Sequence, residues 1–105
     1  MITYEVTAEV EEWLAGTYER YMRETHIPEV LATGCFQAAV FARSLPGRYR
    51  TGYLTRSQGD LDRYLEHHTT VLRQDFAAHF PDGVSLSREV WVTVEGWEGT
   101  ARTPV

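Results

Sequence analysis

The strict alternation of apolar and polar residues near the start of the chain, followed by a change of period, constrains the fold most. Residues 2–10 predict a half-buried strand, because successive side chains of a strand point to opposite faces. From Glu11 the apolar residues recur three or four positions apart, at Leu14, Tyr18 and Met22. That spacing predicts an amphipathic helix directly after the strand.

Pro28 and Gly34 indicate where this helical region ends. Proline disfavours helical geometry at the residue before it, here Ile27, so we expect the first helix to end near His26. Pro28 can then open a short second turn of helix. Gly34 is expected to stop that turn in the left-handed conformation that glycine tolerates.

Two further strands are expected over residues 35–43 and 48–56, joined by a tight turn. Pro46 and Gly47 occupy the two central positions that a type II turn prefers, which predicts a hairpin. The first of these strands carries no charge from Cys35 to Ala42, so we expect it to be buried on both faces.

A long second helix is predicted after the hairpin. Ser57 and Asp60 resemble a capping box, and the break Pro81-Asp82-Gly83 marks the far end. A last strand is expected over residues 86–94. The apolar stripe of the helix comprises Leu61, Tyr64, Leu65, His68, Leu72, Phe76 and Phe80.

This order of elements, β-α-β-β-α-β, predicts an α+β protein with a ferredoxin-like, four-stranded antiparallel sheet and both helices on one face. Residues 1–95 should form a single domain, and residues 96–105 an irregular tail. In the common strand order of this fold, the uncharged strand 35–43 is an edge strand. Edge strands are normally protected by charge, by proline or by a covering element, and residues 35–42 of this strand contain neither a charge nor a proline. We therefore predict a homodimer in which a second copy of the chain covers this strand.

Composition excludes several classes of partner. The net charge of −5 disfavours binding to a phosphate backbone, so no nucleic-acid partner is expected. No apolar run is long enough to span a membrane or to act as a signal peptide. The single cysteine, Cys35, cannot form an internal disulfide and has apolar neighbours, which predicts a buried thiol and a cytoplasmic protein.

One segment is specific enough to suggest a family. It comprises residues 26–36, HIPEVLATGCF, and further matching positions are Trp13, Tyr21-Met22, Tyr53, Asp60-Leu61, Tyr64-Leu65, His67, Leu72-Arg73, Phe80 and Arg88. Together they resemble a family of short bacterial proteins known as domain of unknown function 4286. The resemblance implies a ferredoxin-like chain similar to the dimeric α/β-barrel proteins, in which two sheets pack face to face around a shared interior. It implies no established activity.

His26 is the candidate catalytic residue. Near a helix end at the mouth of a cavity, it could act as an acid or a base. The alternative is a structural histidine that caps free carbonyl groups.

Four further residues are candidates for ligand binding: Glu5, Tyr53, His68 and Trp91. Glu5 belongs to the polar row of the first strand, and Tyr53 and Trp91 could line a sheet face near it. His68 lies on the apolar stripe and is more easily explained as a core residue. His67 and His68 point about 100° apart on a helix, so we expect no shared metal site, and no cofactor motif is present.

These observations leave more than one function open. A homodimer could bind a small organic molecule in a cavity between its two sheets and oxidise or isomerise it, by fold analogy with cofactor-free monooxygenases. The same dimer could instead be a non-catalytic binding or regulatory module. Arg48 and Arg50 beside Tyr49 give a faint indication of RNA binding.

Overall fold

The computed structural model describes residues 1–100, which form one four-stranded sheet and a layer of helices. The elements in chain order are β1 (Ile2–Val10), a 3-10 turn (Glu12–Leu14), α1 (Ala15–Tyr21), a π-helical turn (Met22–His26), α2 (Ile27–Ala32), β2 (Ala38–Arg43), β3 (Arg48–Thr55), α3 (Gln58–His67), α4 (Thr69–His79) and β4 (Val84–Val92).

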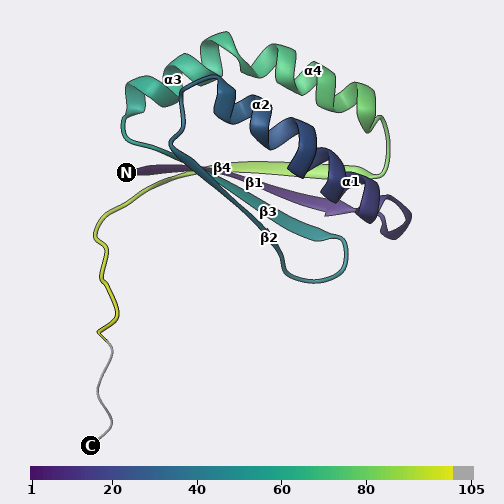
Figure 1. Ribbon diagram of the computed structural model, residues 1–105, viewed down its shortest axis with the longest axis horizontal. Helices are drawn as coiled ribbons and strands as arrows, with labels where there is room; N and C mark the ends of the chain where they lie inside the picture. The colour runs from purple at the N-terminus through teal and green to yellow at the C-terminus, as the bar shows by residue number, and fades with distance from the viewer. Residues whose placement is uncertain (101–105) are drawn as a thin grey trace, which may run out of the picture.

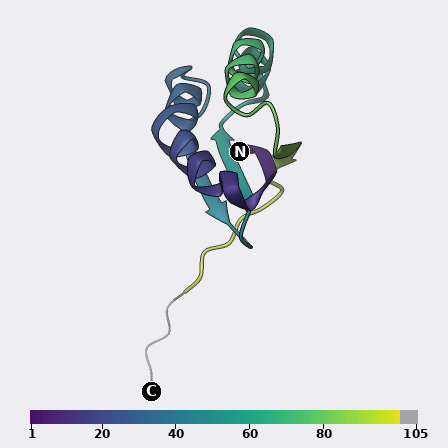
Figure 2. The same ribbon diagram turned by 90° about the vertical axis from the view of Figure 1, so that its right-hand side faces the viewer.

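The sheet has the order β2-β3-β1-β4, and all three pairings are antiparallel. All the helices lie on one side of this sheet and leave the other side uncovered (Figures 1 and 2). The ferredoxin-like α+β fold expected from the order of elements is therefore confirmed. β2 is an edge strand, as predicted, and β4 forms the opposite edge.

The alternation in β1 determines which side chains meet the helices. Ile2, Tyr4, Ala8 and Val10 are buried beneath the helices, whereas the intervening row that contains Glu5 faces the uncovered side. Residues that are directly opposite each other on neighbouring strands lie on the same face of a sheet. The pairing of β1 with its neighbours therefore tells which face each residue of those strands occupies. We call the two sides the helix face and the open face.

The buried side chains form two clusters on the helix face. One cluster lies beneath α2 and α3 and comprises Ile2, Tyr4, Val30, Cys35, Phe36, Tyr53, Leu61, Tyr64 and Leu72. The other lies beneath α1 and the end of α4 and comprises Ala8, Val10, Tyr18, Tyr21, Met22, Tyr49, Phe76 and Phe80. Aromatic rings dominate both clusters, so the core is built from large planar side chains.

The first helix does not end near His26, and that prediction was wrong. The chain stays helical through Ala32, with a π-helical turn at residues 22–26 in which the backbone N–H of Ile27 donates to the carbonyl of Met22. This wider turn accommodates Pro28, which has no N–H to donate and whose ring would crowd an α-helical carbonyl. His26 therefore lies within a continuous helical segment.

The second helix is also interrupted, at a position that the sequence analysis did not anticipate. His68 adopts φ −123° and ψ −27°, and it separates α3 from α4. The observed limits of two strands also differ from the predicted ones. β2 begins at Ala38 rather than at residue 35, and β4 spans residues 84–92 rather than 86–94. Residues 93–100 form no helix or strand and run away from the domain (Figure 1), while 101–105 of the predicted tail lie outside the described residues.

The predicted turn and helix start are confirmed in detail. Gly47 has φ +82° in the hairpin turn, and its carbonyl accepts the N–H of Val10 at 2.7 Å. A Cβ at this position would collide with the carbonyl oxygen of Val10, so glycine is required for two reasons. The hydroxyl of Ser57 accepts the N–H of Asp60 at 3.1 Å and caps α3.

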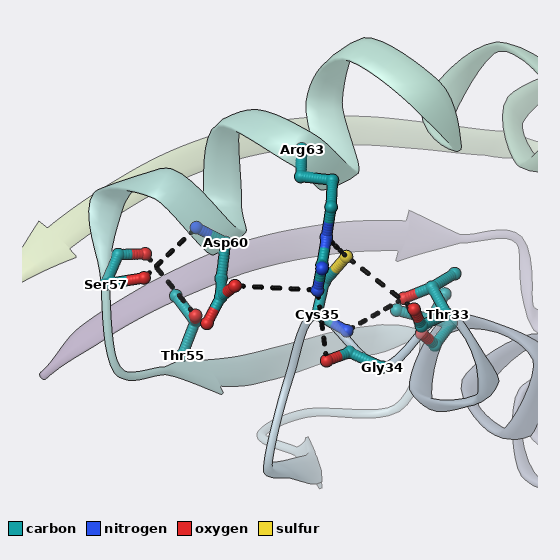
Figure 3. A network of polar contacts seen from close by, with 8 residues as sticks. Thr33, Gly34, Cys35, Thr55, Ser57, Asp60 and Arg63 are labelled. Atoms are coloured by element: carbon teal, nitrogen blue, oxygen red, sulfur yellow. Dashed lines mark hydrogen bonds and ion pairs between the residues drawn. The ribbon is translucent and has the colours of Figure 1, made fainter.

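Arg63 connects α3 to the loop that precedes β2. Its Nε donates to the buried sulfur of Cys35 at 3.4 Å, and its Nη2 donates to the carbonyl of Gly34 and lies 3.5 Å from Asp60 (Figure 3). The sulfur is thus enclosed by backbone and by an arginine of the same domain, in agreement with the prediction of a buried thiol.

Candidate functional site

A partly enclosed cavity lies between the helices and the helix face of the sheet. Its volume is about 40 Å³, which is room for roughly three water molecules. The side chains that line it come from β1, β3, β4 and from the helices above them. They are Tyr4, Val6, Tyr18, Met22, His26, Tyr53, Tyr64, Leu72, Arg73, Phe76, Leu86 and Arg88.

Two polar atoms in this lining are buried and have no hydrogen-bond partner among the described residues. They are Nδ1 of His26 and the hydroxyl oxygen of Tyr53. Buried polar atoms are nearly always paired, so an unpaired pair in one cavity calls for an explanation. A bound molecule that supplies both partners would satisfy them.

The charged residues of the lining all carry the same sign. Arg73 and Arg88 have exposed side chains at the edge of the cavity, and Arg73 donates to the hydroxyl of Tyr4 at 3.2 Å. No aspartate or glutamate is among the lining residues, although the whole chain carries 15 acidic residues against 10 basic ones. Neither arginine forms an ion pair within residues 1–100.

Burial controls the protonation of His26. Desolvation, helped by the positive charge of Arg88, lowers the pKa of His26 from 6.5 to about 4, and Asp75 only partly opposes this. The imidazole is therefore neutral at pH 7 and can accept a proton or a hydrogen bond. Burial likewise raises the pKa of the Tyr64 hydroxyl to about 12, so that group remains protonated.

The position of His26 follows from the π-helical turn. Such turns insert one extra residue into a helix and are frequent at functional sites. The ring of His26 packs against Phe76 on α4 and stacks on Tyr21, with ring centroids 5.6 Å and 6.0 Å away. The aromatic neighbours hold the imidazole in place while its Nδ1 stays free.

The structure brings together only two of the five residues proposed from the sequence. His26 and Tyr53 line the same cavity, but Glu5 and Trp91 lie on the open face of the sheet. Glu5 instead borders a shallow groove there. His68 is half-buried, stacks on the ring of Tyr64 and does not line the cavity. The expected grouping of Tyr53 with the polar row of β1 was wrong, because Tyr53 is opposite Tyr4 in register and shares its face.

Sequence reasoning missed the two arginines and Tyr4 as members of a site. A signal for Arg88 was present, because it interrupts the apolar alternation of β4, in which the other residues on its face are Val84, Leu86, Val90 and Val92. An inward-pointing arginine in an apolar row marks either a protected edge or a binding site.

Within residues 1–100, no three His, Cys, Asp or Glu side chains lie close enough together to share a metal ion. Among the described residues, no helix combines the length and the apolar character needed to cross a membrane.

The four-stranded antiparallel sheet, covered on one face by helices, defines a ferredoxin-like protein, and solved structures agree. A protein from Deinococcus radiodurans described as a "putative antibiotic biosynthesis monooxygenase" is similar with a TM-score of 0.70 and 14% identity, over 96% of this chain and 100% of that one. A dimeric ferredoxin-like protein from an uncultured marine organism is similar with a TM-score of 0.69 and 9% identity, over 93% and 99%. Such low identities establish the fold alone.

The chain belongs to the family described as domain of unknown function (DUF4286), whose sequence pattern matches residues 1–94. The resemblance noted in the sequence is thereby confirmed. No curated protein matches the chain.

Proposed function

We propose that this protein binds a compact aromatic molecule with a hydroxyl group in the cavity between its helices and its sheet. The observation that carries the proposal is the pair of buried, unpaired polar atoms, Nδ1 of His26 and the hydroxyl of Tyr53, in a cavity otherwise lined largely by aromatic and aliphatic side chains. A ligand hydroxyl between them would satisfy both atoms. An aromatic ring is larger than the empty space of about 40 Å³, so binding requires the lining to move, and the unbranched side chain of Met22 is the one best able to shift.

The same arrangement supports a chemical role for His26. A neutral imidazole beside a ligand hydroxyl can accept its proton, which leaves an electron-rich anion. From a dihydroxy ring, such an anion can pass two electrons to molecular oxygen, which takes up the two protons and leaves a quinone and hydrogen peroxide. Alternatively, the proton returns to a ring carbon and gives the keto isomer. These are the oxidation and isomerisation considered from the sequence. The name given to the Deinococcus radiodurans protein supports the first of these by analogy of fold.

Replacement of Tyr53 by Phe tests the ligand site. Because the Tyr53 hydroxyl is buried without a partner, its removal should raise the free energy of unfolding of the empty protein by about 1 kcal/mol. It should also weaken binding of phenol by about tenfold, since one hydrogen bond to the ligand is lost. Phenol binding is followed by NMR through the ring signals of His26.

Tyr21→Phe is the matched control, because the Tyr21 hydroxyl is also buried and unpaired but does not line the cavity. It should stabilise the protein to a similar extent and leave phenol binding unchanged. Absence of any effect of phenol on the His26 signals would contradict the proposed site. Incubation of hydroxyphenols in air distinguishes the two roles, since an enzyme consumes them and a binding module returns them intact.

We also propose that the protein acts as a homodimer, with the open faces of two sheets packed together. On this face Val40 is 61% exposed and Trp91 is 51% exposed, and both are large apolar side chains. Glu5 is directly opposite Glu89, and neither forms an ion pair within the described residues, while Arg50 lies one row away and is also unpaired. A second copy would cover the apolar side chains and could supply the missing opposite charges.

Val40→Glu is expected to convert the dimer into a monomer, because the new carboxylate would be buried without a partner in the interface. The monomer itself should keep its stability, since Val40 is exposed in the single chain. Light scattering measures the mass, and Val71→Glu on α4, at 60% exposure, is the control that should remain dimeric. A wild-type protein that is monomeric at micromolar concentration would refute the dimer.

A further inference from the structure

The charges around the cavity say more about its ligand than its shape does. Arg73 on α4 and Arg88 on β4 approach the cavity from two separate elements, and both influence the hydroxyl of Tyr64 on α3. Their side chains reach solvent at the edge of the cavity. In an acidic chain, two arginines that form no ion pair within the described residues, in a lining that contains no aspartate or glutamate, make the edge of the cavity locally positive.

We propose that Arg73 and Arg88 bind a carboxylate at the edge of the cavity, so that the ligand is a compact aromatic acid such as a hydroxybenzoate. This inference rests on the proposed function and adds the chemical class of the ligand. The ring would extend inward from the carboxylate towards Tyr53 and His26. Guanidinium groups suit this role because their planar donors match the two oxygens of a carboxylate.

The hydrogen bond from Arg73 to Tyr4 supports the inference. Nη2 of Arg73 donates to the Tyr4 hydroxyl at 3.2 Å, and Tyr4 is itself buried in the strand. This contact directs the guanidinium towards the cavity, where its remaining donors are left for a ligand. A surface arginine that serves only solubility has no need of such an anchor.

An anion between the arginines would also prepare His26 for proton transfer. Arg88 is one of the groups that disfavour the charged imidazole, and Asp75 is the acidic residue that opposes it. A bound carboxylate would offset the charge of Arg88 and so raise the pKa of His26 towards its ordinary value. Binding of the ligand carboxylate and the basicity of His26 would then both depend on Arg88.

The experiment compares 4-hydroxybenzoate with 4-hydroxybenzamide, which has the same size but no charge at neutral pH. Both are titrated by calorimetry into the wild type, Arg73→Gln, Arg88→Gln and the control Arg56→Gln, whose side chain is exposed and does not line the cavity. We expect the acid to bind at least tenfold more tightly than the amide. Each cavity variant should lose about tenfold in affinity for the acid and little for the amide, and Arg56→Gln should lose nothing.

Three results would overturn the inference, and they differ from a failure of the proposed function. If the amide binds as tightly as the acid and Tyr53→Phe weakens both, the cavity is a ligand site without selectivity for anions. If Arg56→Gln weakens the acid as much as Arg88→Gln does, the attraction is a general surface effect. If neither compound binds while phenol still perturbs the His26 ring signals, the ligand is not an aromatic acid, but the proposed ligand site in the cavity stands.

Discussion

Tyr18→Ala is expected to reduce the free energy of unfolding by about 4 kcal/mol, the usual cost of deleting a large buried aromatic ring. Tyr18 is 1% exposed and lies at the centre of the cluster beneath α1. Its ring centroid is 5.0 Å from that of Tyr49 on β3 and 5.8 Å from that of Phe80 after α4. One side chain thus connects α1 to the sheet and to the end of α4.

Chemical denaturation measures this loss, and the size of the domain makes it severe. A chain of about 100 residues is stabilised by only about 5–15 kcal/mol, so the variant should be close to unfolding at room temperature. Trp13→Ala is the control, because Trp13 is an even larger aromatic side chain but is 73% exposed, and it should cost about 0.5 kcal/mol or less. Equal losses in the two variants would show that Tyr18 is not the centre of this cluster.

Between pH 7 and pH 4, His26 alone is expected to remove about 3 kcal/mol from the free energy of unfolding. Its pKa is about 4 in the folded protein and 6.5 in an ordinary environment. Above pH 6.5 the imidazole is neutral in both states and contributes no pH dependence. Between these values the unfolded chain binds a proton that the folded chain does not, so stability falls as pH falls. Below about pH 4 both states are protonated and the loss is complete.

Denaturation at a series of pH values, for the wild type and for His26→Gln, isolates this contribution. The slope of stability against pH should become shallower in the variant between pH 6.5 and 4, because no group at position 26 takes up a proton. His67→Gln is the control, since His67 is exposed on α3. A titration of the His26 ring signal near pH 6.5 in the folded protein would contradict the expectation.

Local patterns predicted the fold because each of them acts over a few residues. The alternation of β1, the turn at Gly47 and the cap at Ser57 depend on neighbouring side chains and on backbone geometry, and the structure contains all three. The limits of the helices were less predictable. Taken alone, Pro28 indicates the end of a helix. The helical segment continues past Pro28 because a π-helical turn precedes it, and no local pattern predicts that turn.

The site was harder to predict than the fold, because it depends on residues far apart in the sequence. His26 was recognised as a titratable group, and Tyr53 as an aromatic residue of a strand. Their common face follows only from the register that aligns Tyr53 with Tyr4. Arg73 and Arg88 both line the cavity although they belong to α4 and β4, and no local pattern brings these two elements to the same site.

The π-helical turn also has a consequence for how related sequences should be aligned. An extra residue in a helix rotates everything after it by about 100°. Tyr18 and Tyr21 are buried before the turn and Met22 at its first residue. Val30 is buried after the turn, at a position out of phase with a regular α-helical stripe. A relative that lacked one residue in this segment would keep a helix of normal geometry. Its histidine, if present, would then point away from the cavity, so the length of this segment is as informative as its composition.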